Sequence, residues 1–323
     1  MVKQMVSGPS LRGRYERVLP HHDVGPRGRT PRLALVADLD SRELNGMFVL
    51  SRLAAFLRGV EAGERRGLRL RERVVIVPTV GAWNERGAGT RPISRARGNP
   101  HRRSGEWAMT RAVMEITQAA YYRVDVHPVS LDVEELPHLS LYAPNDDERA
   151  SACLFGLPAV IERPAEDESM PDLVRAWRFR GGENFVIHLG QAGSLQTGHC
   201  ETLFQALVAF LDRTGIIGGL RLVGGEEQLR YFGSRQVVLV RAAQPGIFAS
   251  NLEVGRWVRS GEELGRIHDG FTGGVRGQVT APASGLLASL RRQPLLREQD
   301  LVARILAPNA VAEGSFGAAG GVA

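Results

Sequence analysis

Two hydrophobic patterns alternate along the first 220 or so residues of the chain. Continuous apolar runs, typical of strands buried on both faces, occupy Arg32–Ala37, Arg73–Pro78, Tyr122–His127 and Asn184–Gly190. Helical spacing of apolar residues marks 44–59, 107–122 and 200–214, and glycines after the third segment end it. This alternation predicts an N-terminal arm over 1–30 and an α/β domain over 31–230, with a mixed, mostly parallel sheet and flanking helices.

Beyond about Tyr231 the pattern changes to short β-like runs separated by glycine and proline. These runs are Val237–Arg241, Gly246–Phe248, Gly265–His268, Gly277–Thr280, Gly285–Ala288 and Leu301–Ile305. Many short strands with regular turns predict a separate all-β domain over 231–307. The Gly/Ala-rich tail over 308–323 is expected to be disordered.

Composition narrows the class of protein. A chain of 323 residues is long enough for two domains. The formal charge is +6, yet Lys3 is the only lysine, and the dense arginine run over 91–103 lacks the interleaved aromatic residues that stack on bases. We therefore expect an arginine-rich loop that faces an anionic small molecule, and no nucleic-acid partner.

Other classes are also disfavoured. No apolar stretch approaches the roughly 18 residues of a membrane span, and the first 20 residues lack an apolar core, so a cytoplasmic protein without membrane contact is expected. The two cysteines, Cys153 and Cys200, are too few and too far apart for a disulfide framework or a cysteine-rich metal site.

The C-terminal runs contain a recognisable motif. The string Val254–Ile267, followed by Val279–Leu287, resembles the two halves of a biotinyl/lipoyl-type barrel-sandwich. Carriers of that type hold a lysine in the turn between the halves. The corresponding turn here, His268–Arg276, contains no lysine, so attachment of a swinging arm is excluded.

A lysine-free barrel behind an α/β domain, opened by the string Arg241–Phe248, is similar to the succinylglutamate desuccinylase/aspartoacylase family. The resemblance covers most of 31–307. It implies a zinc-carboxypeptidase-like domain that removes acyl groups, and a C-terminal domain that shields the mouth of the active site.

The resemblance also implies a metal site. The family's first strand ends in a Gly-x-His-Gly-x-Glu loop with two zinc ligands, and a later Asp-x-His supplies the third. Here Asp40 takes the place of the first histidine, whereas Glu43 and His127 match, the latter two residues after Asp125. Asp40, Glu43 and His127 are thus the implied ligands, for Zn²⁺ or, with two carboxylates, for Mn²⁺ or Fe²⁺. The alternative is two solvated loop carboxylates and a histidine at a strand end.

The family's general base is a glutamate two residues before a glycine at the end of a strand, and His188 occupies that position. A histidine near its ordinary pKa of about 6.5 can act as a base, join the metal, or simply be buried and hydrogen-bonded. Arg91 and Arg102 are candidates to bind a substrate carboxylate, although the family's Phe-Pro-Gly string is absent beside them. Either arginine can equally be a surface residue.

Two functions follow from these residues. The first is a metal-dependent deacylase that cleaves the amide bond of an N-acyl amino acid or related small molecule. The second is a catalytically degenerate paralogue that binds a ligand or assembles, as a homo- or hetero-oligomer, with a homologous subunit. Asp40 and His188 motivate the second, because both replace usual site residues.

Overall fold

The computed structural model describes residues 19–37, 44–79, 110–127, 130–220 and 230–308. Four parallel strands form the centre of the α/β part, in the order β4 (Val74–Val77), β2 (Leu33–Ala37), β5 (Tyr122–His127) and β8 (Glu183–Gly190). Their residues are buried on both faces, His127 excepted. The parallel strands expected from the apolar runs are thereby confirmed.

Strands without that apolar signature make the sheet mixed. The long strand β6 (Val133–Tyr142) runs antiparallel to β8 and parallel to β7 (Ala159–Arg163), which in turn pairs with β10 (Arg230–Gly233). At the other edge β1 (His22–Val24) lies antiparallel to β4, inside the segment expected to be an arm. A separate small ladder joins β3 (Arg69–Leu70) to β9 (Ile217–Gly218).

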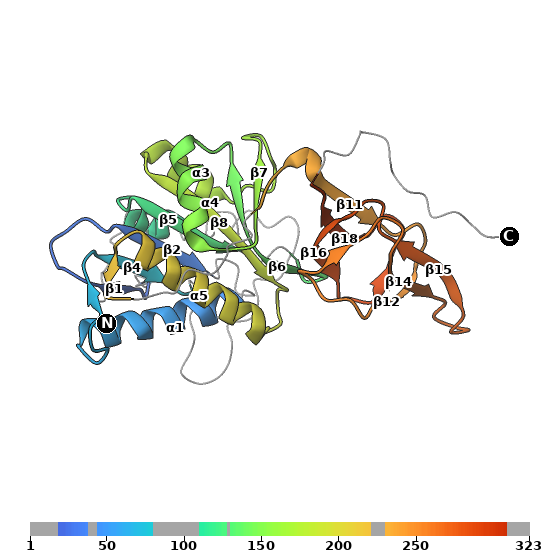
Figure 1. Cartoon of the computed structure of the whole chain (residues 1–323), viewed down its shortest axis with the longest axis horizontal. Coiled ribbons are helices and arrows are strands. Elements are labelled where there is room, and N and C mark those ends of the chain that lie inside the picture. The colour runs from blue at the N-terminus through green and yellow to red at the C-terminus, as the bar shows by residue number, and fades with distance from the viewer. Residues whose placement is uncertain (1–18, 38–43, 80–109, 128–129, 221–229, 309–323) are drawn as a thin grey trace, which may run out of the picture.

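Helices cover both faces of this sheet (Figure 1). On one face α1 (Leu44–Glu61) and α5 (Thr197–Arg213) pack together, with the rings of Phe56 and Phe204 6.1 Å apart. On the other, the indole of Trp177 in α4 (Asp172–Trp177) donates to the Thr117 hydroxyl at 2.9 Å, in the helix over 110–117. The remaining described helical elements are α3 (Asp146–Ala152), η1 (Cys153–Phe155), η2 (Arg178–Arg180) and η3 (Ser234–Gln236).

The C-terminal strands form two layers around a core of their own. One layer contains β11 (Val237–Arg241), β18 (Leu301–Leu306), β16 (Gly285–Arg291) and β13 (Trp257–Val258). The other contains β15 (Val275–Thr280), β14 (Glu263–His268), β12 (Gly246–Ala249) and β17 (Leu295–Leu296). Phe248 and Ile267 from the second layer meet Leu287 and Val302 from the first. The β-rich character expected beyond residue 231 is confirmed.

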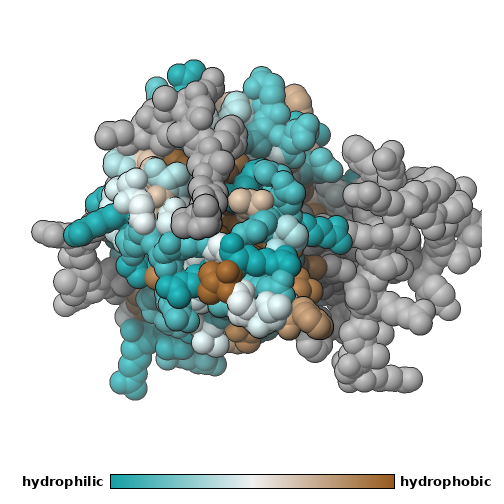
Figure 2. All heavy atoms as spheres, turned by 90° about the vertical axis from the view of Figure 1, so that its right-hand side faces the viewer, coloured by the Kyte–Doolittle hydropathy of each residue, from teal (hydrophilic) through white to brown (hydrophobic). Residues whose placement is uncertain are grey.

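Strand β16 joins the two parts, because it pairs antiparallel with the beginning of β6. Ser289 lies opposite Glu135 and Leu290 opposite Glu134, so the large sheet continues into the C-terminal strands (Figure 1). Seen from the C-terminal end, the described surface is mainly hydrophilic, with small apolar areas (Figure 2). None of the helices in the described residues is long and apolar enough to cross a membrane.

Candidate active site

The carboxyl ends of the parallel strands bring two histidines together. His127 is the last residue of β5, and it lies directly opposite His188 of β8 in the ladder. Their ring centroids are 6.3 Å apart and the ring planes nearly perpendicular. Two residues chosen from sequence therefore share one edge of the sheet, where ligands of open α/β sheets bind. Asp40, Glu43, Arg91 and Arg102 lie outside the described residues, although β2 ends at this same edge with Ala37.

His127 is the more accessible of the pair, with 31% of its side chain exposed. Its Nδ1 atom lies 4.0 Å from Oδ2 of Asp125, which is completely buried. This separation exceeds a hydrogen bond, but it puts a carboxylate next to one ring nitrogen, as is common in metal-binding histidines, whose other nitrogen binds the metal.

His188 is buried, and its Nδ1 lies 3.1 Å from the backbone oxygen of His127. A carbonyl oxygen only accepts, so Nδ1 carries the hydrogen and Nε2 keeps a lone pair when the ring is neutral. Nε2 is buried and has no hydrogen-bond partner among the described residues. Desolvation, helped by the charges of His138, His127 and Arg163, lowers the pKa of His188 well below 6.5. The ordinary pKa assumed from sequence is therefore wrong, and the ring is neutral at pH 7.

A third histidine, which the sequence motifs missed, continues the row. His138 of β6 is opposite His188 in the ladder, and their rings lie 5.1 Å apart with a tilt of 31°. Its Nδ1 is 2.9 Å from the Leu136 oxygen, and its Nε2 is 3.9 Å from Oε2 of Glu135. Burial lowers the pKa of His138 to about 4. The available signal was the cluster of Glu134, Glu135 and His138 in one segment, which belongs to no motif of the family.

Glu135 connects this row to the C-terminal part, since its carboxylate pairs with Arg304 of β18. Burial raises the pKa of Glu135, whereas the positive charges of Arg304 and Arg163 oppose that rise. The guanidinium of Arg304 thus offsets part of the cost of a carboxyl group in the interior.

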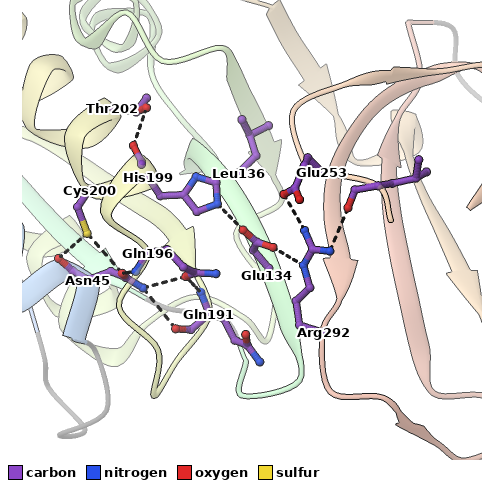
Figure 3. A network of polar contacts seen from close by, with 12 residues as sticks. Asn45, Glu134, Leu136, Gln191, Gln196, His199, Cys200, Thr202, Glu253 and Arg292 are labelled. Carbon is purple, nitrogen blue, oxygen red and sulfur yellow. Dashed lines mark hydrogen bonds and ion pairs between the residues drawn. The ribbon is translucent and has the colours of Figure 1, made fainter. Parts of the chain in front are cut away.

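The loop after β8 is fixed by the first turn of α1 (Figure 3). The Asn45 side chain donates to Oε1 of Gln196 at 3.2 Å and to the Gln191 oxygen at 3.3 Å, and it accepts from the Gln196 backbone N–H at 2.7 Å. Gly190 has a φ of +64°, and a Cβ there would lie 2.6 Å from Nδ2 of Asn45. These contacts hold the start of α1 against the end of β8.

A second polar contact beside the site joins the two parts of the chain. Glu134 accepts a hydrogen bond from His199 at 2.6 Å and pairs with Arg292, which also contacts Glu253 at 3.1 Å (Figure 3). Burial pushes the pKa of Glu134 upward, but the hydrogen bonds from His199 and Arg292 outweigh it, so the pKa is lowered. The ionised carboxylate therefore clamps α5 and β6 to the C-terminal part.

A metal ion fits the chemistry of His127, the one implied ligand among the described residues, which is a partly exposed imidazole with the buried carboxylate of Asp125 4.0 Å from its Nδ1. The described residues alone contain no group of three or more metal-binding side chains. The remaining ligands would have to come from outside them, where Asp40 and Glu43 lie.

The sequence matches no protein-family model, and a search of curated proteins finds no match either. Solved structures do match. The product-bound ectoine utilization protein EutE (DoeB) from Ruegeria pomeroyi aligns with a TM-score of 0.66 and 20% identity, over 90% of this chain and 89% of that one. A succinylglutamate desuccinylase/aspartoacylase from Rhodobacter sphaeroides gives a TM-score of 0.63 and 20% identity, over 85% and 86%.

A third structure, of a succinylglutamate desuccinylase/aspartoacylase family protein from Shewanella amazonensis, aligns over 95% of this chain and 99% of that one, with a TM-score of 0.65 and 14% identity. The likeness extends over both parts of the chain, and at such identities it concerns the fold. The chain has the fold of the succinylglutamate desuccinylase/aspartoacylase proteins, as its sequence strings implied.

Proposed function

We propose that the chain is a metal-dependent deacylase that hydrolyses the amide bond of an N-acyl amino acid or a related small molecule. The observation that carries this proposal is the pairing of His127 and His188 at the carboxyl edge of the sheet. Support comes from the fold, which is that of proteins named desuccinylases and aspartoacylases.

Asp40, Glu43 and His127 would hold the metal, which is Zn²⁺ or, because of the two carboxylates, Mn²⁺ or Fe²⁺. When bound, the metal supplies Lewis acidity at the scissile carbonyl. The buried carboxylate of Asp125, 4.0 Å from Nδ1 of His127, would orient that ring when the metal is bound.

His188 is the proposed base: its Nε2 lone pair accepts the proton that the attacking water loses and returns it to the leaving amine as the C–N bond breaks. Burial keeps the ring neutral at pH 7, and the hydrogen bond to the His127 oxygen keeps the hydrogen on Nδ1. Arg91 or Arg102 binds the carboxylate of an anionic substrate, for which the guanidinium fork is suited.

For the C-terminal part we retain the expected limits of 231–307, the barrel-sandwich architecture and the role of shielding the site. The ion pairs Glu135–Arg304 and Glu134–Arg292 support this role, because they place C-terminal residues beside His138 and β6. Cytoplasmic location and assembly with a homologous subunit stay predictions. The Nε2 of His188, which has no hydrogen-bond partner within the described part of the chain, favours the catalytic function over the degenerate paralogue.

Metal content tests the proposal. Untagged protein is loaded with Zn²⁺, Mn²⁺ or Fe²⁺, dialysed and measured by elemental analysis, with His127→Ala, Asp40→Ala and the control His268→Ala, which changes a histidine of the C-terminal hairpin. We expect about one metal ion per chain in the wild type and the control, and a loss of most of it in the other two. A wild-type chain that retains none of the three metals contradicts the proposal.

A further inference from the structure

His127, His188 and His138 form one row across three neighbouring strands. The ladders pair His127 with His188, and His188 with His138, so all three side chains project from the same face of the sheet. Exposure falls along the row, from 31% of the His127 side chain to 3% of the His138 side chain. The site described above uses the first two histidines and leaves His138 without a role.

Burying an imidazole costs free energy unless its nitrogens find hydrogen-bond partners. The Nδ1 of His138 has one in the Leu136 oxygen at 2.9 Å. Its Nε2 faces the carboxyl of Glu135, which Arg304 holds from the C-terminal part. The ring is therefore anchored at Nδ1 by the backbone and fixed by burial, whereas Nε2 and the Glu135 carboxyl are 3.9 Å apart and make no hydrogen bond.

The ring of His138 packs against the ring of His188. The two rings are 5.1 Å apart at a tilt of 31°, which is close to the offset-stacked arrangement of aromatic pairs. His188 is held at one further point, the hydrogen bond from Nδ1 to the His127 oxygen. A single hydrogen bond leaves an imidazole free to rotate about χ2 and exchange its two nitrogens, unless a neighbouring surface blocks the rotation.

We propose that His138 is a positioning residue for His188: its ring blocks rotation of the His188 ring, and so keeps Nδ1 of His188 on the His127 oxygen and the lone pair on Nε2. The flat ring face carries out this role, and the hydrogen bond to the Leu136 oxygen together with burial holds the face in place. The consequence for function rests on His188 being the proposed base, but the geometry of the ring does not.

The tautomer of His188 gives a direct readout. Full-length protein labelled with ¹⁵N-histidine is studied by long-range ¹H–¹⁵N NMR at pH 7.5, where the wild type is expected to show His188 as a single Nδ1–H tautomer. Removal of the His138 ring in His138→Ala is expected to move both ring-nitrogen shifts of His188 toward the average of the two tautomers. The variant His138→Phe, which keeps a flat ring, is expected to leave them unchanged.

His21 supplies the matched control, since it is also buried and its Nδ1 also lies close to the oxygen two residues earlier, at 3.1 Å from Leu19. His21→Ala is expected to leave the His188 shifts unchanged. If the alanine variant of His138 does not fold, His138→Leu, which has volume but no flat face, takes its place.

The inference is overturned if the alanine or leucine variant keeps the wild-type shifts of His188, if the phenylalanine variant loses them, or if His21→Ala perturbs them equally. None of these outcomes depends on metal or substrate. A failure of the proposed function therefore leaves this inference standing, and its own failure leaves the deacylase proposal to be judged by metal content and hydrolysis.

Discussion

The buried ring of His138 lies against His188, with Glu135, Arg163 and Arg304 as the charged groups that influence it. Its folded pKa of about 4 lies below the ordinary 6.5, so between these values the unfolded chain binds a proton that the folded chain does not. The neutral ring of His138 therefore costs the folded state no stability above pH 6.5, and the free energy of unfolding falls as the pH drops toward 4. Glu135 acts in the opposite direction, because burial raises its pKa.

A difference between two proteins isolates the contribution of His138. The free energy of unfolding from urea titrations is expected to fall between pH 7 and pH 5 by about 2 kcal/mol more in the wild type than in His138→Phe, which cannot take up the proton. His188 remains in both proteins, so its effect largely cancels. Equal pH dependence in the two proteins would show that His138 titrates normally.

At the scale of elements, β6 holds most of what sequence did not predict. The strand contains Glu134, Glu135, Pro137 and His138, a composition that argues against a buried strand, yet all ten of its residues are buried. The charges are tolerated because Arg292 and Arg304 reach them from more than 150 residues further along the chain. Partners so distant leave no local pattern.

The elements that could be predicted had local causes. Continuous apolar runs located β2, β4, β5 and β8, and glycine-bounded runs located the C-terminal strands, because strands buried on both faces need little else. Of the candidate site residues, only those whose family motif fell on these strands could be located, namely His127 and His188, and their roles stay predictions. His138 lies on β6 and was missed with it, and Asp40, Glu43, Arg91 and Arg102 stay predictions.

The junction between β6 and the C-terminal part allows a matched test. Glu134→Ala removes a buried carboxylate that His199 and Arg292 share, and it is expected to lower the free energy of unfolding by about 2–3 kcal/mol. Glu253 binds the same Arg292 but has 82% of its side chain exposed, so Glu253→Ala is expected to cost less than about 0.5 kcal/mol. Guanidinium titrations measure both. Equal losses of stability in the two variants would contradict the role of Glu134 in holding α5 and β6 to the C-terminal part.

The turn after β8 gives a second test at this scale. Gly190→Ala puts a side chain at a φ of +64° and against Asn45, and is expected to cost about 2 kcal/mol or more. At Gly198, in the first turn of α5, a Cβ meets nothing within 4 Å. Gly198→Ala is therefore expected to leave stability unchanged or to raise it by up to about 1 kcal/mol. A tolerated alanine at 190 would contradict the close approach of α1.

In the whole molecule, one sheet passes from the α/β part into the C-terminal part, and ion pairs at Glu134 and Glu135 cross the same boundary. The proposed base thus lies one strand away from residues held by the C-terminal part. The parallel strands β5 and β8 position His127 and His188. The strand β6 lies next to β8, and arginines of the C-terminal part neutralise its buried carboxylates.

The most direct measurement of the proposed chemistry is the rate of amide hydrolysis by metal-loaded protein on a panel of N-acyl amino acids, for the wild type and His188→Ala. We expect the wild type to hydrolyse at least one substrate. We also expect a kcat lower by about 100-fold or more in His188→Ala, which should keep its metal. Absence of hydrolysis across the panel, or the same kcat in both proteins, would contradict the proposed chemistry.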